Sequence, residues 1–120
     1  MSEFTVAPIK PVVDIATLEA IDIRVGKLES VEEVAGSDKL MKLRVNFGDH
    51  WRTILAGIKK ERANPREIEG LQALFVLNLP PRKMAGEISE GMLFDIGYAD
   101  GVTPVLAVPE RPVPNGTRAG

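Results

Sequence analysis

The sequence has 120 residues, 44% of them hydrophobic and 27% charged, which is usual for one globular domain. It contains no cysteine and one histidine, which excludes disulfides, thiolate nucleophiles and cysteine-ligated metal sites and leaves little for histidine chemistry. No apolar run is long enough to span a membrane, and the first residues do not resemble a signal peptide. We therefore expect a cytoplasmic protein without a membrane partner.

The net charge is −2, but positive charge is concentrated in the middle of the chain. Residues 39–66 contain eight lysines and arginines against two acids, whereas residues 1–38 contain three cations and eight acids. Residues 67–120 contain four cations and seven acids. One interpretation is a local basic face on an acidic protein; scattered, solvated lysines and arginines explain the charge pattern equally well.

The first third of the chain predicts an arm, a short helix and one long strand. Residues 1–13 are spaced by prolines and lack periodicity, as is typical of an extended arm. Asp14 is a candidate N-cap for the helical sequence IATLEAI. Residues 21–34 then alternate apolar and polar side chains, with a slip near Gly26. A glycine in such a pattern predicts a bulge or sharp bend, as the first strand of a small barrel requires.

The basic middle of the chain predicts a β-hairpin. Residues 40–47 and 51–56 read as its strands, and residues 48–50 form a tight turn that places the single histidine on the surface. Lys42 and Arg44 share the polar face of the first strand because side chains alternate along it.

The remaining elements complete an all-β fold. Residues 57–70 predict a short helical connection, and Leu71–Leu79 a buried central strand that stops at two consecutive prolines. Residues 92–98 predict the last clear strand, and residues 103–108 are a candidate for a short further one. This pattern favours a five-stranded Greek-key OB-fold barrel with a short N-terminal helix and a short helical connection. An SH3-like barrel is the main alternative, but it leaves the helical connection unexplained.

Residues 78–93, NLPPRKMAGEISEGML, join two predicted strands by a loop that combines charge with flexible apolar side chains. Arg82 and Lys83 follow the prolines directly, and Met84 comes next. Such a loop suits an anionic, partly apolar partner, and a solvated polar loop is the alternative on these residues alone.

Recognition of single-stranded or looped RNA requires cations for the phosphates and flat or soft side chains for the bases. Phe47, Phe75 and Phe94 are expected in the core, whereas Trp51 fits either a core or a stacking position. With few aromatic platforms, recognition is expected to depend on shape and phosphate contacts rather than on base sequence. Phosphate-loop, dinucleotide and metalloprotease motifs are absent, and Ser37, Ser89 and Thr53 lack a plausible adjacent base. We therefore expect no catalytic residue, no cofactor and no metal.

The motifs IDIRVGKLESVEEV, SDKL, RTILAGI, NLPPRKMAGEISEGML and VPNGTRAG, in this order, resemble the tRNA-binding domain family. Members occur at the C-terminus of methionyl-tRNA synthetases, as stand-alone structure-specific tRNA-binding proteins and as CsaA proteins. The resemblance implies that residues 14–120 form an OB fold, assemble as a homodimer and bind tRNA. CsaA proteins supply an alternative function, a protein-export chaperone for unfolded or precursor polypeptides. An aminoacyl-tRNA synthetase or an unfolded polypeptide is a further candidate partner.

The resemblance places the family's binding residues within residues 78–93, and the strand cations complete the candidate site. The candidate RNA-binding residues are Lys42, Arg44, Arg52, Asn78, Pro81, Arg82, Lys83, Met84, Ser89, Glu90 and Met92. The cations are assigned to phosphate, and Asn78, Met84 and Ser89 to sugar or base edges. The dimer interface is assigned by resemblance to the short helix and the tail, whose apolar side chains could be core residues instead: Ile15, Leu18, Val105 and Leu106.

Overall fold

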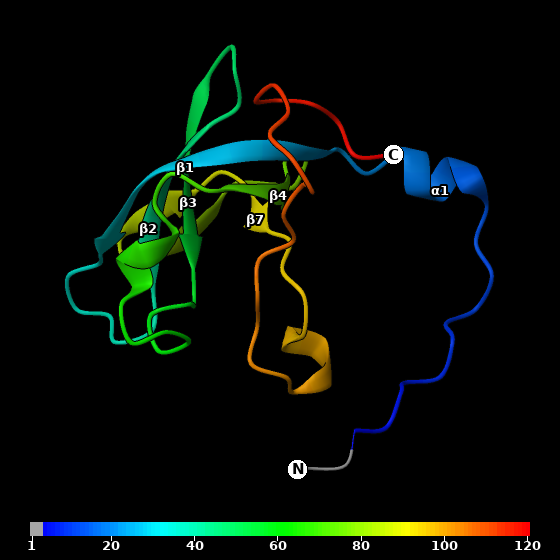
Figure 1. The fold of residues 1–120 in the computed structure, drawn as a ribbon, viewed down its shortest axis with the longest axis horizontal. Helices are drawn as coiled ribbons and strands as arrows, with labels where there is room; N and C mark the ends of the chain where they lie inside the picture. The colour runs from blue at the N-terminus through cyan, green and yellow to red at the C-terminus, as the bar shows by residue number, and fades with distance from the viewer. Residues whose placement is uncertain (1–3) are drawn as a thin grey trace.

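In the computed structural model, which describes residues 4–120, the chain forms a curled antiparallel sheet of five strands and a separate two-stranded hairpin (Figure 1). The sheet has the order β3-β2-β1-β4-β7. Its strands are β1 (Ile23–Glu33), β2 (Met41–Asn46), β3 (Trp51–Ala56), β4 (Gln72–Val76) and β7 (Met92–Leu93). The hairpin consists of β5 (Arg82–Met84) and β6 (Glu87–Ser89); the helical elements are α1 (Ile15–Glu19) and the 3-10 turns η1 (Pro65–Ile68) and η2 (Tyr98–Asp100). The predicted all-β OB fold is confirmed.

The sheet is built on β1, whose first half pairs with β4 and whose second half pairs with β2. The register shifts between Leu28 and Ser30, so the bulge lies there and not at Gly26, where it was predicted. Gly26 has another role, because a Cβ at this position would lie 2.5 Å from Cγ1 of Val45 and 2.6 Å from Cε1 of Phe47. The absent side chain therefore lets the core pack directly against the β1 backbone.

The hydrophobic core fills the inside of the curled sheet. The largest fully buried side chains are Phe75, Leu28, Met41, Leu43, Ile54, Ile58, Val31 and Val45. The rings of Phe47 and Phe75 pack edge to face with centroids 5.5 Å apart, which confirms both as core residues. Phe94 is 42% exposed, so its predicted core position is wrong. The strand β7 ends one residue before it, and the chain then turns away towards η2.

The predicted strand Leu71–Leu79 is shorter in the structure, where β4 spans Gln72–Val76. Leu71 and Leu79, the first and last residues of the predicted strand, lie outside β4 and are 46% and 44% exposed. The amide of Leu77 still donates to the carbonyl of Asp22 at 2.8 Å, which extends the β1–β4 pairing by one residue past Val76. The strand therefore ends before the two prolines are reached.

The connections after β7 also differ in length from the predictions. The predicted strand over residues 92–98 retains two residues, and residues 103–108 contribute a single bridge between Val105 and Ile96. The N-terminal helix and the helical connection are present as α1 and η1. Asp14 is the N-cap of α1, although its side chain makes no capping hydrogen bond. No helix within residues 4–120 has the length and apolar character needed to cross a membrane.

The C-terminal segment runs along β1 and carries the chain end back to α1 (Figure 1). The amide of Gly116 donates to the carbonyl of Val25 at 2.7 Å, and the amide of Val25 donates to the carbonyl of Thr117 at 2.9 Å. The side-chain amide of Gln72 donates to the carbonyl of Val113 at 2.6 Å and fastens the same segment to β4. The tail is therefore part of the folded barrel.

Candidate nucleic-acid interface

The segment predicted as a polar loop folds into the β5–β6 hairpin. Residues 85–86 form its turn with φ values of 49° and 81°, the left-handed conformation that a two-residue hairpin turn requires. Arg82 pairs with Ser89, and Lys83 pairs with Ile88. Because paired residues share a face, Arg82 lies on the Ser89 side of the hairpin and Lys83 on the opposite side. The two adjacent cations therefore point in different directions.

Ser89 fastens this hairpin to β3. It is 3% exposed, and its hydroxyl accepts from the amide of Leu55 at 3.0 Å and donates to the carbonyl of Gly91 at 3.0 Å. The amide of Glu90 donates to the carbonyl of Thr53 at 2.8 Å, and the Glu90 carboxylate accepts from the Thr53 amide at 3.2 Å. These contacts close the barrel along β3. We therefore assign Ser89, a candidate RNA contact, to barrel closure.

Replacing Ser89 by alanine is expected to lower the free energy of unfolding by about 1–2 kcal/mol, because the Leu55 amide loses its buried acceptor. Urea denaturation followed by circular dichroism measures this change. Ser30→Ala on β1, a half-buried serine, is the control and should change stability little. An unchanged stability together with lost RNA affinity would instead place the Ser89 hydroxyl on the RNA.

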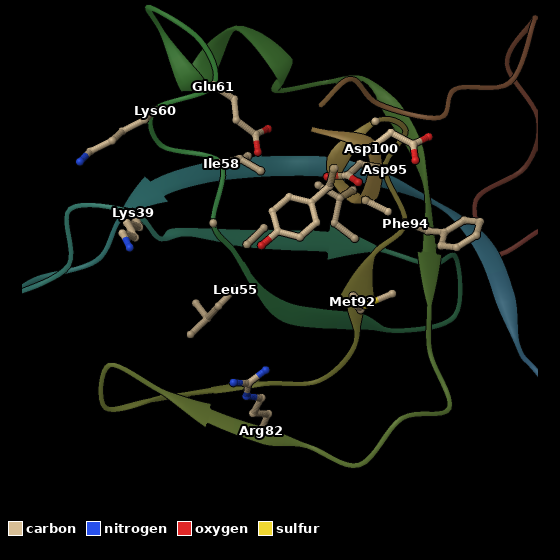
Figure 2. Close-up of a pocket in the computed structure, with 16 residues that line it drawn as sticks. Lys39, Leu55, Ile58, Lys60, Glu61, Arg82, Met92, Phe94, Asp95 and Asp100 are labelled. Carbon is tan, nitrogen blue, oxygen red and sulfur yellow. The ribbon is translucent and has the colours of Figure 1, made fainter. Parts of the chain in front are cut away.

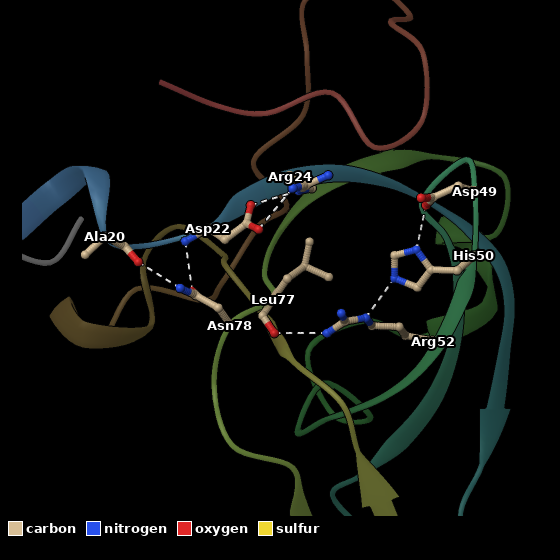
Figure 3. Close-up of polar contacts among 8 residues, drawn as sticks. All are labelled: Ala20, Asp22, Arg24, Asp49, His50, Arg52, Leu77 and Asn78. Atoms are coloured by element: carbon tan, nitrogen blue, oxygen red, sulfur yellow. Dashed lines mark hydrogen bonds and ion pairs between the residues drawn. The ribbon is translucent and has the colours of Figure 1, made fainter.

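Arg52, predicted as a phosphate contact, joins three segments through its guanidinium. Figure 3 shows its contacts with His50 and Leu77. Nη1 donates to the carbonyls of Leu77 at 2.9 Å and Glu90 at 3.0 Å. Nε donates to Nε2 of His50 at 2.9 Å, and Nδ1 of His50 lies 2.7 Å from a carboxylate oxygen of Asp49. The hydrogen bond from His50 lowers the pKa of Asp49 from its ordinary value of 3.8. Arg52 thus ties the end of β4 to the residue that follows β6.

Arg52→Lys is expected to lower the free energy of unfolding by about 2 kcal/mol although it keeps the charge, because one ammonium cannot take the place of both Nη1, which bonds to the two carbonyls, and Nε, which bonds to His50. Chemical denaturation provides the measurement. Arg44→Lys is the matched control, since within residues 4–120 the Arg44 side chain makes one hydrogen bond, to the hydroxyl of Thr53 at 3.2 Å. A fully stable Arg52→Lys variant would show that the guanidinium contacts do not hold the barrel together.

Asn78 also uses both polar atoms of its side chain in hydrogen bonds within the protein (Figure 3). Its Oδ1 accepts from the amide of Asp22 at 2.8 Å, and its Nδ2 donates to the carbonyl of Ala20 at 2.7 Å. Nε of Arg24 lies 2.8 Å from the Asp22 carboxylate, and this hydrogen bond lowers the pKa of Asp22 from 3.8. Asn78 therefore fixes the chain between α1 and β1 against the end of β4.

Two further candidate cations lie on the outer surface of β2. Nζ of Lys42 is 3.3 Å from a carboxylate oxygen of Glu87, which links β2 to the β5–β6 hairpin. The guanidinium carbon of Arg44 lies 5.5 Å from the ring centroid of Trp51, which is 49% exposed. Trp51 therefore lies at the surface, beside the basic side chains, and not in the core.

Among the candidate site cations, Arg82 and Lys83 are the least constrained. Both are exposed, and within residues 4–120 neither makes an ion pair or a side-chain hydrogen bond. Pro81 and Met92 are exposed nearby in sequence, and Met84 is half-buried on β5. These five residues offer charge and apolar surface that the fold leaves accessible.

The matching protein family is described as "Putative tRNA binding domain", and its model covers residues 23–118. The chain belongs to this tRNA-binding domain family. The domain is similar to the MetRS-related protein from Pyrococcus horikoshii, with 32% identity, 92% of this chain and 100% of that chain covered, and a TM-score of 0.85. It is also similar to the chaperone CsaA from Bacillus anthracis str. Ames, with 29% identity, coverage of 92% and 100%, and a TM-score of 0.79.

The CsaA chaperone protein from Picrophilus torridus is a third similar structure, with 27% identity, coverage of 91% and 100%, and a TM-score of 0.76. The family resemblance inferred from the sequence motifs is thus confirmed, including the likeness to CsaA proteins. Sequence reasoning missed the contacts that the candidate residues make within the chain itself. The contacting residues are distant in sequence: Arg52 and Glu90 lie 38 positions apart, and Lys42 and Glu87 lie 45 apart.

Proposed function

We propose that this domain binds tRNA as a non-catalytic module that recognises backbone charge and shape. The observation that carries the proposal is the exposed pair Arg82 and Lys83, two cations without a protein partner within residues 4–120. They lie on a hairpin that Ser89 and Glu90 fasten to the barrel. The hairpin backbone therefore holds both cations at defined positions, from which their donors can reach phosphate oxygens. Membership of the tRNA-binding domain family supports this function.

The remaining candidate residues form two groups: residues that would contact the RNA, and residues that hold the contact surface in place. Lys42, Arg44 and Trp51 extend the basic surface along β2 and β3, where phosphates could follow the strands. Arg52 and Asn78 hold the base of this surface through their contacts with neighbouring carbonyls and amides. Because the surface offers few aromatic rings, the fold of the RNA and its phosphates supply most of the recognition.

The decisive test of tRNA binding compares bulk tRNA with a DNA duplex of similar phosphate number at low salt. Filter binding is expected to show saturable tRNA binding and weaker duplex binding, because a duplex supplies phosphates without the folded shape. Absence of tRNA binding would refute the proposed function. Equal affinity for both nucleic acids would show that charge alone is recognised.

We further propose that the domain acts as a homodimer through α1 and the extended arm. Residues 4–13 leave the barrel as an extended chain in which Ile9 and Val12 are each 99% exposed (Figure 1). In α1, Ile15 is 69% and Leu18 is 54% exposed, beside a groove of about 650 Å³ that Leu74 helps to line. Monomers seldom leave so many large apolar side chains in water. A second copy would cover them and present two basic faces to one tRNA.

Leu18→Glu is expected to convert the dimer to a monomer and to weaken tRNA binding, because a charge would be placed in the apolar contact. Sedimentation velocity gives the oligomeric state and filter binding the affinity. Val102→Glu, at an exposed position outside this surface, is the control. A wild-type protein that sediments as a monomer would contradict the proposed dimer.

A chaperone function is the second candidate, and the likeness to two CsaA structures favours it. The exposed apolar arm and α1 would then cover an unfolded client. Such binding should suppress client aggregation at high salt, where contacts with phosphate are screened. A client effect that disappears with salt or with added tRNA would contradict an independent chaperone site.

A further inference from the structure

A groove of about 800 Å³ lies beside Arg82, between the end of β3, the strand β7 and the turn η2 (Figure 2). Leu55, Ile58 and Met92 give it apolar walls. The charges are separated: carboxylates gather at one end, Arg82 lies at the opposite end, and two lysines lie along one side (Figure 2). The charged residues that line it are Lys39, Lys60, Glu61, Arg82, Asp95 and Asp100.

Asp95 and Glu61 lie at one end of the groove, where their partly buried carboxylates can accept hydrogen bonds. Both are partly buried, and burial raises the pKa of both carboxyls above their ordinary values of 3.8 and 4.5. Arg62 lies 3.5 Å from Glu61 and offsets part of this effect. Asp95 makes no ion pair and no hydrogen bond with another side chain within residues 4–120; a backbone hydrogen bond lowers the pKa of its carboxyl in part, and the remaining lone pairs are available to a donor from outside the protein.

Two aromatic side chains line the same groove. Tyr98 is 76% exposed and Phe94 is 42% exposed. Most of Tyr98 and part of Phe94 therefore remain accessible to a ligand. Exposed rings beside cations are the surfaces on which unpaired bases stack.

We propose that this groove holds one unpaired nucleotide of the bound RNA, with its phosphate near Arg82 and the two lysines and the amino group of its base at Asp95. The inference rests on the proposed tRNA binding and deepens it, since it specifies that the groove holds an unpaired nucleotide whose base carries an amino group. Cytosine N4, adenine N6 and guanine N2 are amino groups that donate hydrogen bonds to a carboxylate, whereas uracil has no amino group and carries at position 4 an oxygen that the carboxylate repels. A paired base cannot enter, because its partner occupies this edge.

The matched probes are tetracytidylate and tetrauridylate, which have the same phosphates and ring size and differ only at positions 3 and 4 of the base. Calorimetric titration of the full chain is expected to show roughly tenfold tighter binding of tetracytidylate, as one carboxylate–amino contact supplies. Backbone amide NMR signals of Asp95 and Tyr98 should shift during the titration.

Asp95→Asn should reduce the preference to about twofold or less, because an amide can accept from cytosine and also donate to uracil. Glu110→Gln is the control, since it removes one negative charge from an exposed tail position and should keep the preference. Thermal unfolding verifies that both variants are folded.

Equal binding of the two tetranucleotides by a protein that still binds tRNA would overturn this inference and leave the proposed function intact. NMR shifts in the groove with an unfolded peptide, and none with either tetranucleotide, would also overturn it. Failure to bind both tRNA and the tetranucleotides would refute the proposed function itself.

Discussion

Replacing Arg82 and Lys83 together by alanine is expected to weaken tRNA binding at least roughly tenfold at low salt, a loss of about 1.4 kcal/mol or more. Both side chains are exposed and unpaired within residues 4–120, so the fold should not depend on them. The thermal unfolding temperature should therefore remain unchanged. Filter binding with several tRNAs measures the effect, which should be similar for all of them because phosphate contacts carry no base information.

The control for this double variant is a comparison of two single variants, Arg82→Ala and Arg111→Ala. Arg111 is also an exposed arginine, and it lies on the tail beside Glu110, 3.5 Å away. Its loss removes the same charge and should leave tRNA affinity nearly unchanged. Equal weakening by the two single variants would show that net charge, and not the position of the hairpin, governs binding.

Gly26→Ala is expected to destabilise the barrel by about 3 kcal/mol, at the upper end of the usual cost of overpacking a core. The added methyl group would lie 2.5 Å from Val45 and 2.6 Å from Phe47, both of which are buried in the centre of the core. Neither side chain can move far without displacing its neighbours. Urea denaturation gives the change in the free energy of unfolding.

Gly57→Ala is the matched control, because a Cβ at this glycine meets no other atom within 4 Å and its φ lies outside the left-handed region. Its stability should stay close to that of the wild type. If Gly26→Ala were equally well tolerated, β1 would not pack against the core as closely as described.

The predictable part of the fold came from local alternation of side chains. Residues 40–47 alternate clearly and contain β2 (Met41–Asn46), whose side chains are buried and half-buried in turn. The strand β3 has the bounds that were predicted. The bulge in β1 was misplaced because a distant residue determines its position. The carboxylate of Glu69 accepts from the amide of Val31 at 2.8 Å, and the amide of Gly70 donates to the carbonyl of Leu28 at 2.7 Å. No local pattern in β1 could indicate these contacts.

The contacts within the candidate site also join residues distant in sequence and could not be predicted from local patterns. Sequence reasoning could select Arg52, Ser89 and Arg82 as polar residues near the barrel opening, but it could not say which side chains already have partners. Ser89 bonds to Leu55, 34 positions away, and Arg52 to Leu77, 25 positions away, whereas Arg82 keeps its donors free within residues 4–120. The groove beside Arg82 was missed because its lining comes from separate segments of the chain.

The most direct measurement of the central claim is the salt dependence of tRNA affinity. If Lys42, Arg44, Arg82 and Lys83 each neutralise one phosphate, the logarithm of the association constant should fall linearly with the logarithm of salt concentration. The expected slope is about −3 per domain, from roughly 0.7 to 0.9 for each phosphate. Absence of binding at low salt, or an affinity that does not change with salt, would contradict the assignment of this surface to the tRNA backbone.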